Sequence, residues 1–175
     1  METGRQDSTP ERRRAPRTIT PLSTPSVDGT GVLRFPLQHP ELHQLVKAAL
    51  DEDGAFNDLT TIATVVSDRR ARATLVAREA GVVCGVPLAL EAFRVLDSKV
   101  AIRVDVEDGT RVSAGTPVLV LSGHARGLLS AERVALNFMQ RLSGIASLTR
   151  RFVDAVAGTG VSILDTRKTT PGWRS

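Results

Sequence analysis

The sequence predicts an α/β protein, and three hydrophobic patterns support this prediction. Residues 42–50 place apolar side chains at helical spacing, whereas residues 100–106 alternate between apolar and polar side chains as a half-buried strand does. Near the C-terminus, the apolar run 161–164 leads into the polar segment 165–172. In a parallel α/β sheet or barrel, such a run is a buried strand whose polar end lies at the edge where ligands bind.

The N-terminal tail is expected to be disordered. Residues 1–32 are rich in Arg, Pro, Ser and Thr and poor in large apolar side chains, a composition that does not build a core. The arginine triplet at 12–14 is either a weak nucleic-acid patch or part of an extension without a role of its own. Because nearby acidic residues dilute its charge, the second interpretation is favoured, and we assign residues 1–35 to the tail.

A helix, a capped turn, a strand and a second helix are expected next. The first helix covers residues 40–50, and the acidic residues and glycine that follow end it. Asp58 is expected to cap the next turn, because its carboxylate can accept backbone N–H groups. The weak alternation of residues 72–78 predicts a strand. Pro87 fits the first turn of a helix that continues to Leu96.

A second β segment is expected in the middle of the chain. After the alternating strand 100–106 and a turn, residues 117–121 form a short apolar strand. The segment 106–119 also resembles half of a biotinyl or lipoyl carrier module. Such a carrier needs a lysine at its exposed hairpin, and no lysine lies between Lys99 and Lys168, so this resemblance concerns shape only.

A long helix is expected from Ser130, which is a suitable N-cap residue. Its polar stripe consists of Arg133, Asn137 and Gln140, which lie at i, i+4 and i+7 and are separate from the apolar face. Ser143–Gly144 is expected to interrupt the helix, after which apolar residues continue at helical spacing towards the strand at 161–164.

Composition limits the kind of protein and its partners. A chain of 175 residues, 41% of them apolar, is long enough for one domain or slightly more with its own core. The net charge of +4 suits an anionic small substrate as well as it suits nucleic acid, but with 3% aromatic residues there is no platform for stacking bases. We therefore expect no nucleic-acid partner. No apolar run approaches the ~20 residues of a membrane helix, and no signal peptide is visible, so no membrane partner is expected either.

The single cysteine points to a reducing compartment. Cys84 cannot form an internal disulfide, so we expect a cytoplasmic protein. Apolar residues precede it and no histidine is near it in the sequence, so we interpret it as a small core residue rather than a nucleophile.

Cations gather in the polar segment near the C-terminus. Arg167 and Lys168 stand beside the hydroxyl of Thr166, directly after the predicted strand. Arginine can grip a carboxylate or phosphate with two parallel hydrogen bonds, and lysine adds a compact charge. The alternative is a strand end with solvated charges.

Four segments resemble one family. Residues 165–172, DTRKTTPG, resemble the signature of the quinolinate phosphoribosyltransferases, also called carboxylating nicotinate-nucleotide pyrophosphorylases. Residues 57–61, 77–85 and 130–146 resemble the same family, and the match runs in the family's order from about Glu41 to the last residue.

The resemblance implies a fold and a reaction. The fold is an N-terminal α/β sandwich followed by an open α/β barrel, in a homodimer with shared active sites. Residues 36–128 would form the sandwich, and residues 129–175 the linking helices and first strand of an incomplete barrel. The reaction joins quinolinate to phosphoribosyl pyrophosphate, giving nicotinate mononucleotide, pyrophosphate and CO2 in NAD biosynthesis. Mg2+ usually accompanies the phosphates.

The resemblance also assigns substrate-binding residues. Thr166, Arg167 and Lys168 match residues of the family's site, and Arg133 matches the arginine that a partner subunit inserts into it. The alternative for Arg133 is an ion pair with Glu132 or with another surface carboxylate.

The family pattern continues beyond Ser175 with further substrate- and metal-binding residues, so we expect the 175-residue chain alone to be an inactive fragment. Two other interpretations stay open. One is a molybdenum-uptake-linked paralogue of the same fold, and the other is a non-catalytic dimerisation or carrier-like module.

Overall fold

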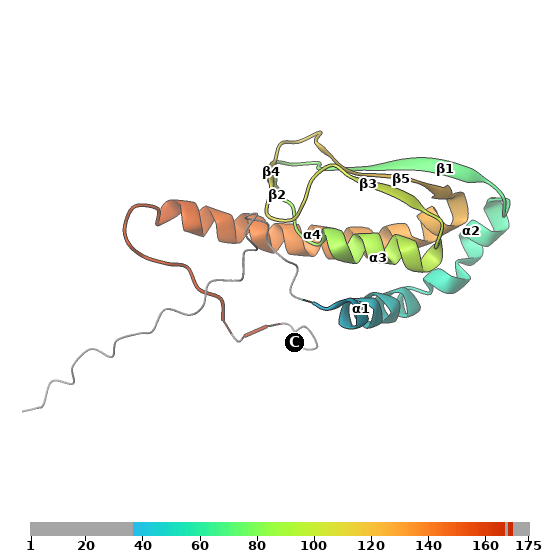
Figure 1. Ribbon diagram of the computed structural model, residues 1–175, viewed down its shortest axis with the longest axis horizontal. Coiled ribbons are helices and arrows are strands. Elements are labelled where there is room, and N and C mark those ends of the chain that lie inside the picture. Colours follow the sequence, from blue (N-terminus) through green and yellow to red (C-terminus); the bar gives the residue numbers. More distant parts are fainter. Residues whose placement is uncertain (1–36, 167, 170–175) are drawn as a thin grey trace, which may run out of the picture.

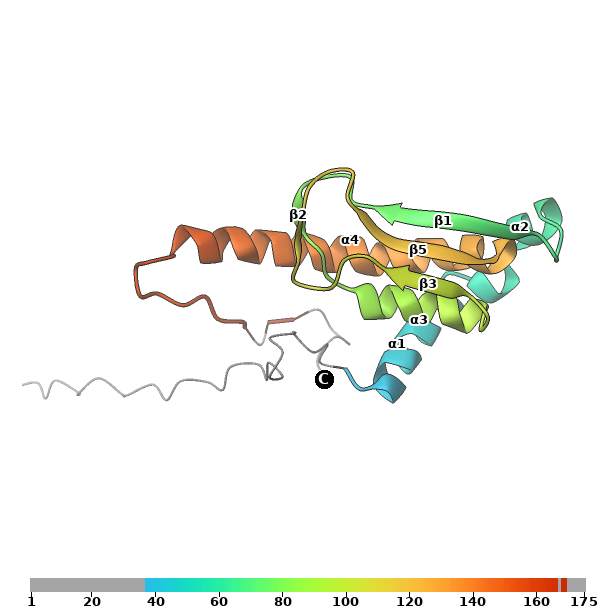
Figure 2. The same cartoon turned by 45° about the horizontal axis from the view of Figure 1, so that its top comes forward.

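A three-stranded antiparallel sheet covers two long helices in the computed structural model, which describes residues 37–166, 168 and 169 (Figure 1). Strand β5 lies between β1 and β3, and a separate two-stranded sheet joins β2 to β4. Helices α3 and α4 pack side by side beneath the three-stranded sheet, and α1 lies against them on the side away from it (Figure 2). The elements are α1 (His39–Glu52), η1 (Ala55–Asn57), α2 (Leu59–Thr64), β1 (Arg70–Val76), β2 (Gly81–Val82), α3 (Val86–Leu96), β3 (Ala101–Val104), β4 (Arg111–Val112), β5 (Pro117–His124) and α4 (Ala125–Ala155).

The core lies between the sheet and the helices. Leu119 and Leu121 of β5 are fully buried, and they meet Phe93 and Leu88 of α3 in one apolar cluster. Leu50 of α1 belongs to the same cluster. Burying one such side chain contributes about 1.5–3 kcal/mol, so aliphatic residues build this core despite the scarcity of aromatic ones. The predicted α/β class, with an N-terminal sandwich, is confirmed.

Capping residues and glycines close in the sequence determine where the helices begin. Helix α1 begins after Gln38, which forms a capping box with Glu41, as expected for a helix in this region. Asp58 caps α2 by accepting the backbone N–H of Thr61, which confirms its predicted role. Gly85 precedes α3 with φ of 100°, a conformation that favours glycine. The strands predicted at 72–78, 100–106 and 117–121 occur with shifted ends, and β5 continues three residues beyond its predicted end.

Helix α4 corrects two predictions. It begins at Ala125 rather than after Ser130, because β5 leads directly into it and the buried carboxylate of Asp97 accepts the N–H of His124 at 2.8 Å. It also continues through 143–144 without interruption. A mid-helix glycine lowers helix stability by only about 1 kcal/mol. The Ser143 hydroxyl compensates for this loss, because it accepts a hydrogen bond from the backbone N–H of Cys84.

The prediction of a strand at 161–164 is wrong for this structure. Residues 161–166 form no strand and are exposed. A strand needs a neighbour to bind its backbone N–H and C=O groups, and no described strand lies beside this segment. The second half of α4 extends beyond the sheet and exposes Ile145, Leu148 and Phe152. Within the described residues, no helix combines the length and the apolar character that a bilayer crossing requires.

Candidate functional site

The structure places the predicted site residues in two separate regions. Arg133 lies in α4, whereas Thr166 and Lys168 lie in the exposed segment after that helix. The backbone N–H of Lys168 lies 3.3 Å from the Thr166 hydroxyl oxygen, which accepts its hydrogen bond. Arg167 lies outside the described residues. In the described part of the chain, no hydrogen bond or ion pair joins Arg133 to Thr166 or Lys168.

Arg133 is held by a carboxylate from the end of α1. Its Nε and Nη2 atoms both lie 3.1 Å from Oδ2 of Asp53. The Arg133 side chain is 61% exposed, and that of Asp53 is 23% exposed. The alternative to a substrate role for Arg133 was an ion pair with Glu132 or with another surface carboxylate. Within one chain, Arg133 does form such an ion pair, and its partner is Asp53 rather than Glu132.

A second carboxylate lies close to the same guanidinium. Asp58 accepts hydrogen bonds from the Thr61 hydroxyl at 2.7 Å, the Thr61 N–H at 3.1 Å and the Ser130 hydroxyl at 3.1 Å. The two Thr61 bonds are the main reason why the pKa of Asp58 lies below its ordinary value, and the charge of Arg133 lowers it further. Asp58 is thus a fixed negative charge that joins the start of α2 to α4.

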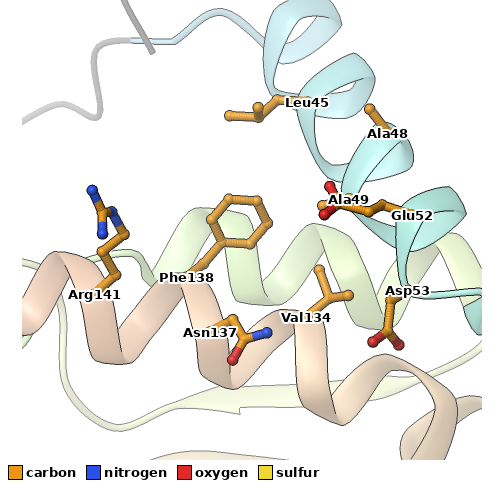
Figure 3. Close-up of a pocket in the computed structure, with 9 residues that line it drawn as sticks. All are labelled: Leu45, Ala48, Ala49, Glu52, Asp53, Val134, Asn137, Phe138 and Arg141. Carbon is orange, nitrogen blue, oxygen red and sulfur yellow. The ribbon is translucent and has the colours of Figure 1, made fainter. Parts of the chain in front are cut away.

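A pocket of about 410 Å³ opens between α1 and α4 beside this ion pair (Figure 3). Its volume falls in the range that accepts small ligands. Apolar side chains form most of the wall, and four polar residues are spread around it. The lining residues are Leu45, Ala48, Ala49, Glu52, Asp53, Val134, Asn137, Phe138 and Arg141.

The pocket revises the predicted polar stripe of α4. Asn137 lines the pocket as that stripe suggests, but Gln140 does not, and Arg141 takes its place. The signal that sequence reasoning missed is the spacing of Arg133, Asn137 and Arg141 at i, i+4 and i+8, which keeps all three on one face of a helix. Asp53 was missed as well, because nothing in the sequence shows that it lies near Arg133.

The charges of this region are mixed. Arg133 and Arg141 are balanced by Glu52 and Asp53 around the pocket. A doubly charged anion needs an excess of cations to replace its hydration, and this surface of one chain does not supply that excess. The arrangement can orient a guanidinium at the surface, but it does not form a complete polyanion site.

Other titratable groups have structural partners. Burial, helped by the nearby charge of Asp108, raises the pKa of Cys84 to about 11, which keeps the thiol protonated and unreactive at neutral pH. This agrees with its interpretation as a core residue. His43 binds the buried Glu91 at 2.7 Å. Across the described residues, no group of three or more His, Cys, Asp or Glu side chains is arranged to hold a metal ion.

The fold and the helix-borne arginine define an N-terminal α/β sandwich module that presents a charged helix face, and comparisons with known proteins identify its family. A family model described as "Quinolinate phosphoribosyl transferase, N-terminal domain" matches residues 58–143. The corresponding C-terminal domain model matches residues 145–175. The junction between the two models falls inside α4.

Individual relatives agree with these models. The chain is 46% identical over 135 residues to a carboxylating nicotinate-nucleotide pyrophosphorylase of Mycobacterium leprae, a match that covers 74% of this chain and 47% of the relative. It is 39% identical over 166 residues to a mitochondrial quinolinate phosphoribosyltransferase of Nicotiana tabacum, covering 91% of this chain and 47% of that protein.

Solved structures show the same relationship. NadC from Streptococcus pyogenes superposes with a TM-score of 0.75 at 39% identity, covering 79% of this chain and 50% of its own. The nicotinate-nucleotide pyrophosphorylase of Francisella tularensis superposes with a TM-score of 0.73 at 34% identity, and the match covers 78% of this chain and 49% of that one. The chain belongs to the quinolinate phosphoribosyltransferase family, and it spans about half the length of the relatives it matches.

Proposed function

We propose that this chain provides the N-terminal half of an enzyme that converts quinolinate and phosphoribosyl pyrophosphate to nicotinate mononucleotide, pyrophosphate and CO2 in NAD biosynthesis. The observation that carries the proposal is Arg133, an exposed guanidinium that Asp53 fixes on α4 within the matched region. The names of the relatives favour this activity over that of a molybdenum-linked paralogue.

Both substrates are polyanions, so a site that binds them needs cations held in fixed positions. Quinolinate carries two carboxylates, and phosphoribosyl pyrophosphate carries several phosphate charges. Arginine binds a carboxylate through two parallel N–H bonds, which sets orientation as well as affinity. The loss of CO2 next to the ring nitrogen leaves carbanion character, which nearby cations stabilise electrostatically. We propose that Arg133 binds a carboxylate of quinolinate in this way.

The separation of Arg133 from the segment that holds Thr166 and Lys168 favours a site assembled from two chains. Among the described residues, no hydrogen bond or ion pair joins Arg133 on α4 to Thr166 or Lys168, whereas a homodimer can bring one copy's helix to the other copy's segment. In this proposal, Arg133 of one subunit faces Thr166, Arg167 and Lys168 of the other. The mixed charges around Arg133 support it, because the remaining cations have to come from elsewhere.

Mg2+ is proposed to accompany phosphoribosyl pyrophosphate. The described residues do not fit a metal site, since they contain no suitable group of ligands. We therefore assign no protein ligand to the ion and no catalytic step to it. We further propose a cytoplasmic location, supported by the single reduced cysteine, and small anions rather than nucleic acid or membranes as partners.

The test is to express the open reading frame as it occurs in the cell and to supply quinolinate, phosphoribosyl pyrophosphate and Mg2+. Formation of nicotinate mononucleotide and CO2 is expected. Arg133→Ala should lower kcat/KM by about 100-fold, the size of effect seen when a substrate loses its positioning contact, while circular dichroism stays unchanged. Absence of the product, or an unchanged kcat/KM in the variant, contradicts the proposal.

A separate expectation concerns the 175-residue chain alone, which we propose to be inactive. Purified chain should form no nicotinate mononucleotide under the same conditions, and detectable product would overturn this expectation.

A further inference from the structure

The contact between Arg133 and Asp53 leaves part of the guanidinium available. The Nε and Nη2 atoms share the single oxygen Oδ2 of Asp53, each at 3.1 Å. A guanidinium has five N–H donors. The Nε–H donates a hydrogen bond to Asp53, and Nη2 lies within ion-pair distance of the same oxygen, so the contact engages at most two donors. The outer edge, where Nη1 and Nη2 each direct one N–H away from Asp53, keeps the parallel pair of donors that a carboxylate accepts. Binding to Asp53 and binding to an anion are therefore compatible.

The carboxylate of Asp53 does not stabilise the helix to which it belongs. Asp53 follows the last residue of α1, where the negative end of the helix dipole disfavours an acidic side chain. Its backbone is fixed, because its N–H binds the carbonyl of Ala49 at 3.0 Å and Gly54 turns the chain with φ of 68°. Arg133 is the ion-pair partner that the described residues offer it.

We propose that Asp53 is a positioning residue, which fixes the guanidinium of Arg133 with its outer N–H pair ready to bind a carboxylate of the substrate. This inference rests on the proposed function. A free arginine side chain samples many rotamers, and a fixed carboxylate removes most of that freedom before the ligand arrives. Asp58 adds a second negative charge to the surroundings of Arg133.

Removing the Arg133–Asp53 ion pair should change substrate binding rather than the stability of the fold. Because Arg133 is mostly exposed, the ion pair adds little to the stability of the fold. Asp53→Ala should therefore stay folded and keep its melting temperature. The expected defect is in substrate binding: the KM for quinolinate rises about 10-fold, and kcat changes less than about 3-fold.

Two further variants make the comparison sharper. Asp53→Asn keeps an oxygen acceptor but loses the charge, so its KM should lie between those of the wild type and Asp53→Ala. Asp51→Ala is the matched control, because Asp51 is a carboxylate in the last turn of the same helix, 54% exposed and paired with Lys47. It should leave both kinetic constants unchanged.

The decisive experiment is a double-mutant cycle on the enzyme expressed from its complete open reading frame. If Asp53 acts through Arg133, then Asp53→Ala has no further effect on kcat/KM once Arg133→Ala is present. Additive effects of the two changes, or an unchanged KM in Asp53→Ala, overturn the inference while the proposed function stands. A lower KM in Asp53→Ala also overturns it, because Asp53 would then compete with substrate. A wild-type enzyme that forms no nicotinate mononucleotide removes the proposed function, and this inference with it.

Discussion

Replacing Asp97 with alanine is expected to loosen the start of α4, the helix that carries Arg133. Asp97 is only 8% exposed and lies where α3 ends and α4 begins. Its Oδ2 accepts the backbone N–H of His124 at 2.8 Å, and its Oδ1 accepts that of Lys99 at 3.0 Å. The ring Nδ1 of His124 lies 3.1 Å from Oδ2. Alanine removes all three contacts at once.

The expected loss follows from the two backbone contacts. Hydrogen bonds to a charged acceptor contribute about 1.5–3 kcal/mol each. Lys99 is exposed, so water can replace the carboxylate there, whereas the N–H of His124 keeps no equivalent partner. A loss of about 3 kcal/mol in the free energy of unfolding is expected. For a domain of this size it lowers Tm by about 6–12 °C.

Thermal denaturation followed by circular dichroism measures this loss. Asp105→Ala is the control, because Asp105 is a surface carboxylate paired with Arg103, and its removal should leave Tm nearly unchanged. Equal shifts in the two variants, or a shift below about 2 °C in Asp97→Ala, would show that Asp97 does not hold the start of α4 in this way.

The same contact makes a pH prediction. Burial raises the pKa of Asp97, but the N–H groups of His124 and Lys99 lower it by more, so it lies below its ordinary value. A depressed carboxyl pKa adds stability above the unfolded value of about 3.9, and this stability is lost as the pH falls through the lower folded value. The Tm difference between wild type and Asp97→Ala should therefore shrink below about pH 4.

Three further predictions follow from packing and reactivity. Gly127→Ala should destabilise the protein by about 1–2 kcal/mol, because the added Cβ would lie 2.9 Å from that of Asp97, and chemical denaturation measures this change. Gly144→Ala, in the same helix with no atom within 4 Å of the added Cβ, should instead stabilise it by about 0.5–1 kcal/mol in the same assay. Cys84 should react with iodoacetamide at pH 8 about 100-fold more slowly in the folded protein than in urea, because its pKa is about 11, and mass spectrometry gives the two rates.

The sequence predicts those elements whose signals are local. Pro87 and Asp58 act within a few residues of their own positions, so the starts of α3 and α2 agree with expectation. The start of α4 was missed because its support, Asp97, lies 27 residues before His124. Likewise, Ser143 suggests a helix break until its partner Cys84, 59 residues away, is known.

The candidate site shows the same limit. Arg133 could be identified from the sequence by its place on the polar stripe of the helix and by its match to the family pattern. Its partner Asp53, however, is 80 residues earlier in the chain. Charge alone could not choose Asp53 over Glu132 or other carboxylates. The strand expected at 161–164 depends on neighbouring strands that the described residues do not include, so its apolar pattern alone does not produce it.

Subunit mixing can show whether Arg133 completes a site whose other cations belong to a second copy of the protein. Arg133→Ala and Lys168→Ala variants of the complete enzyme, each impaired alone, are unfolded together and refolded as a mixture. Half of the dimers are then mixed, and one of the two sites in each mixed dimer is intact, so about a quarter of wild-type activity should return. Activity that stays at the level of the separate variants would show that both residues serve the same subunit's site, or no site at all, and would contradict a site shared between two subunits.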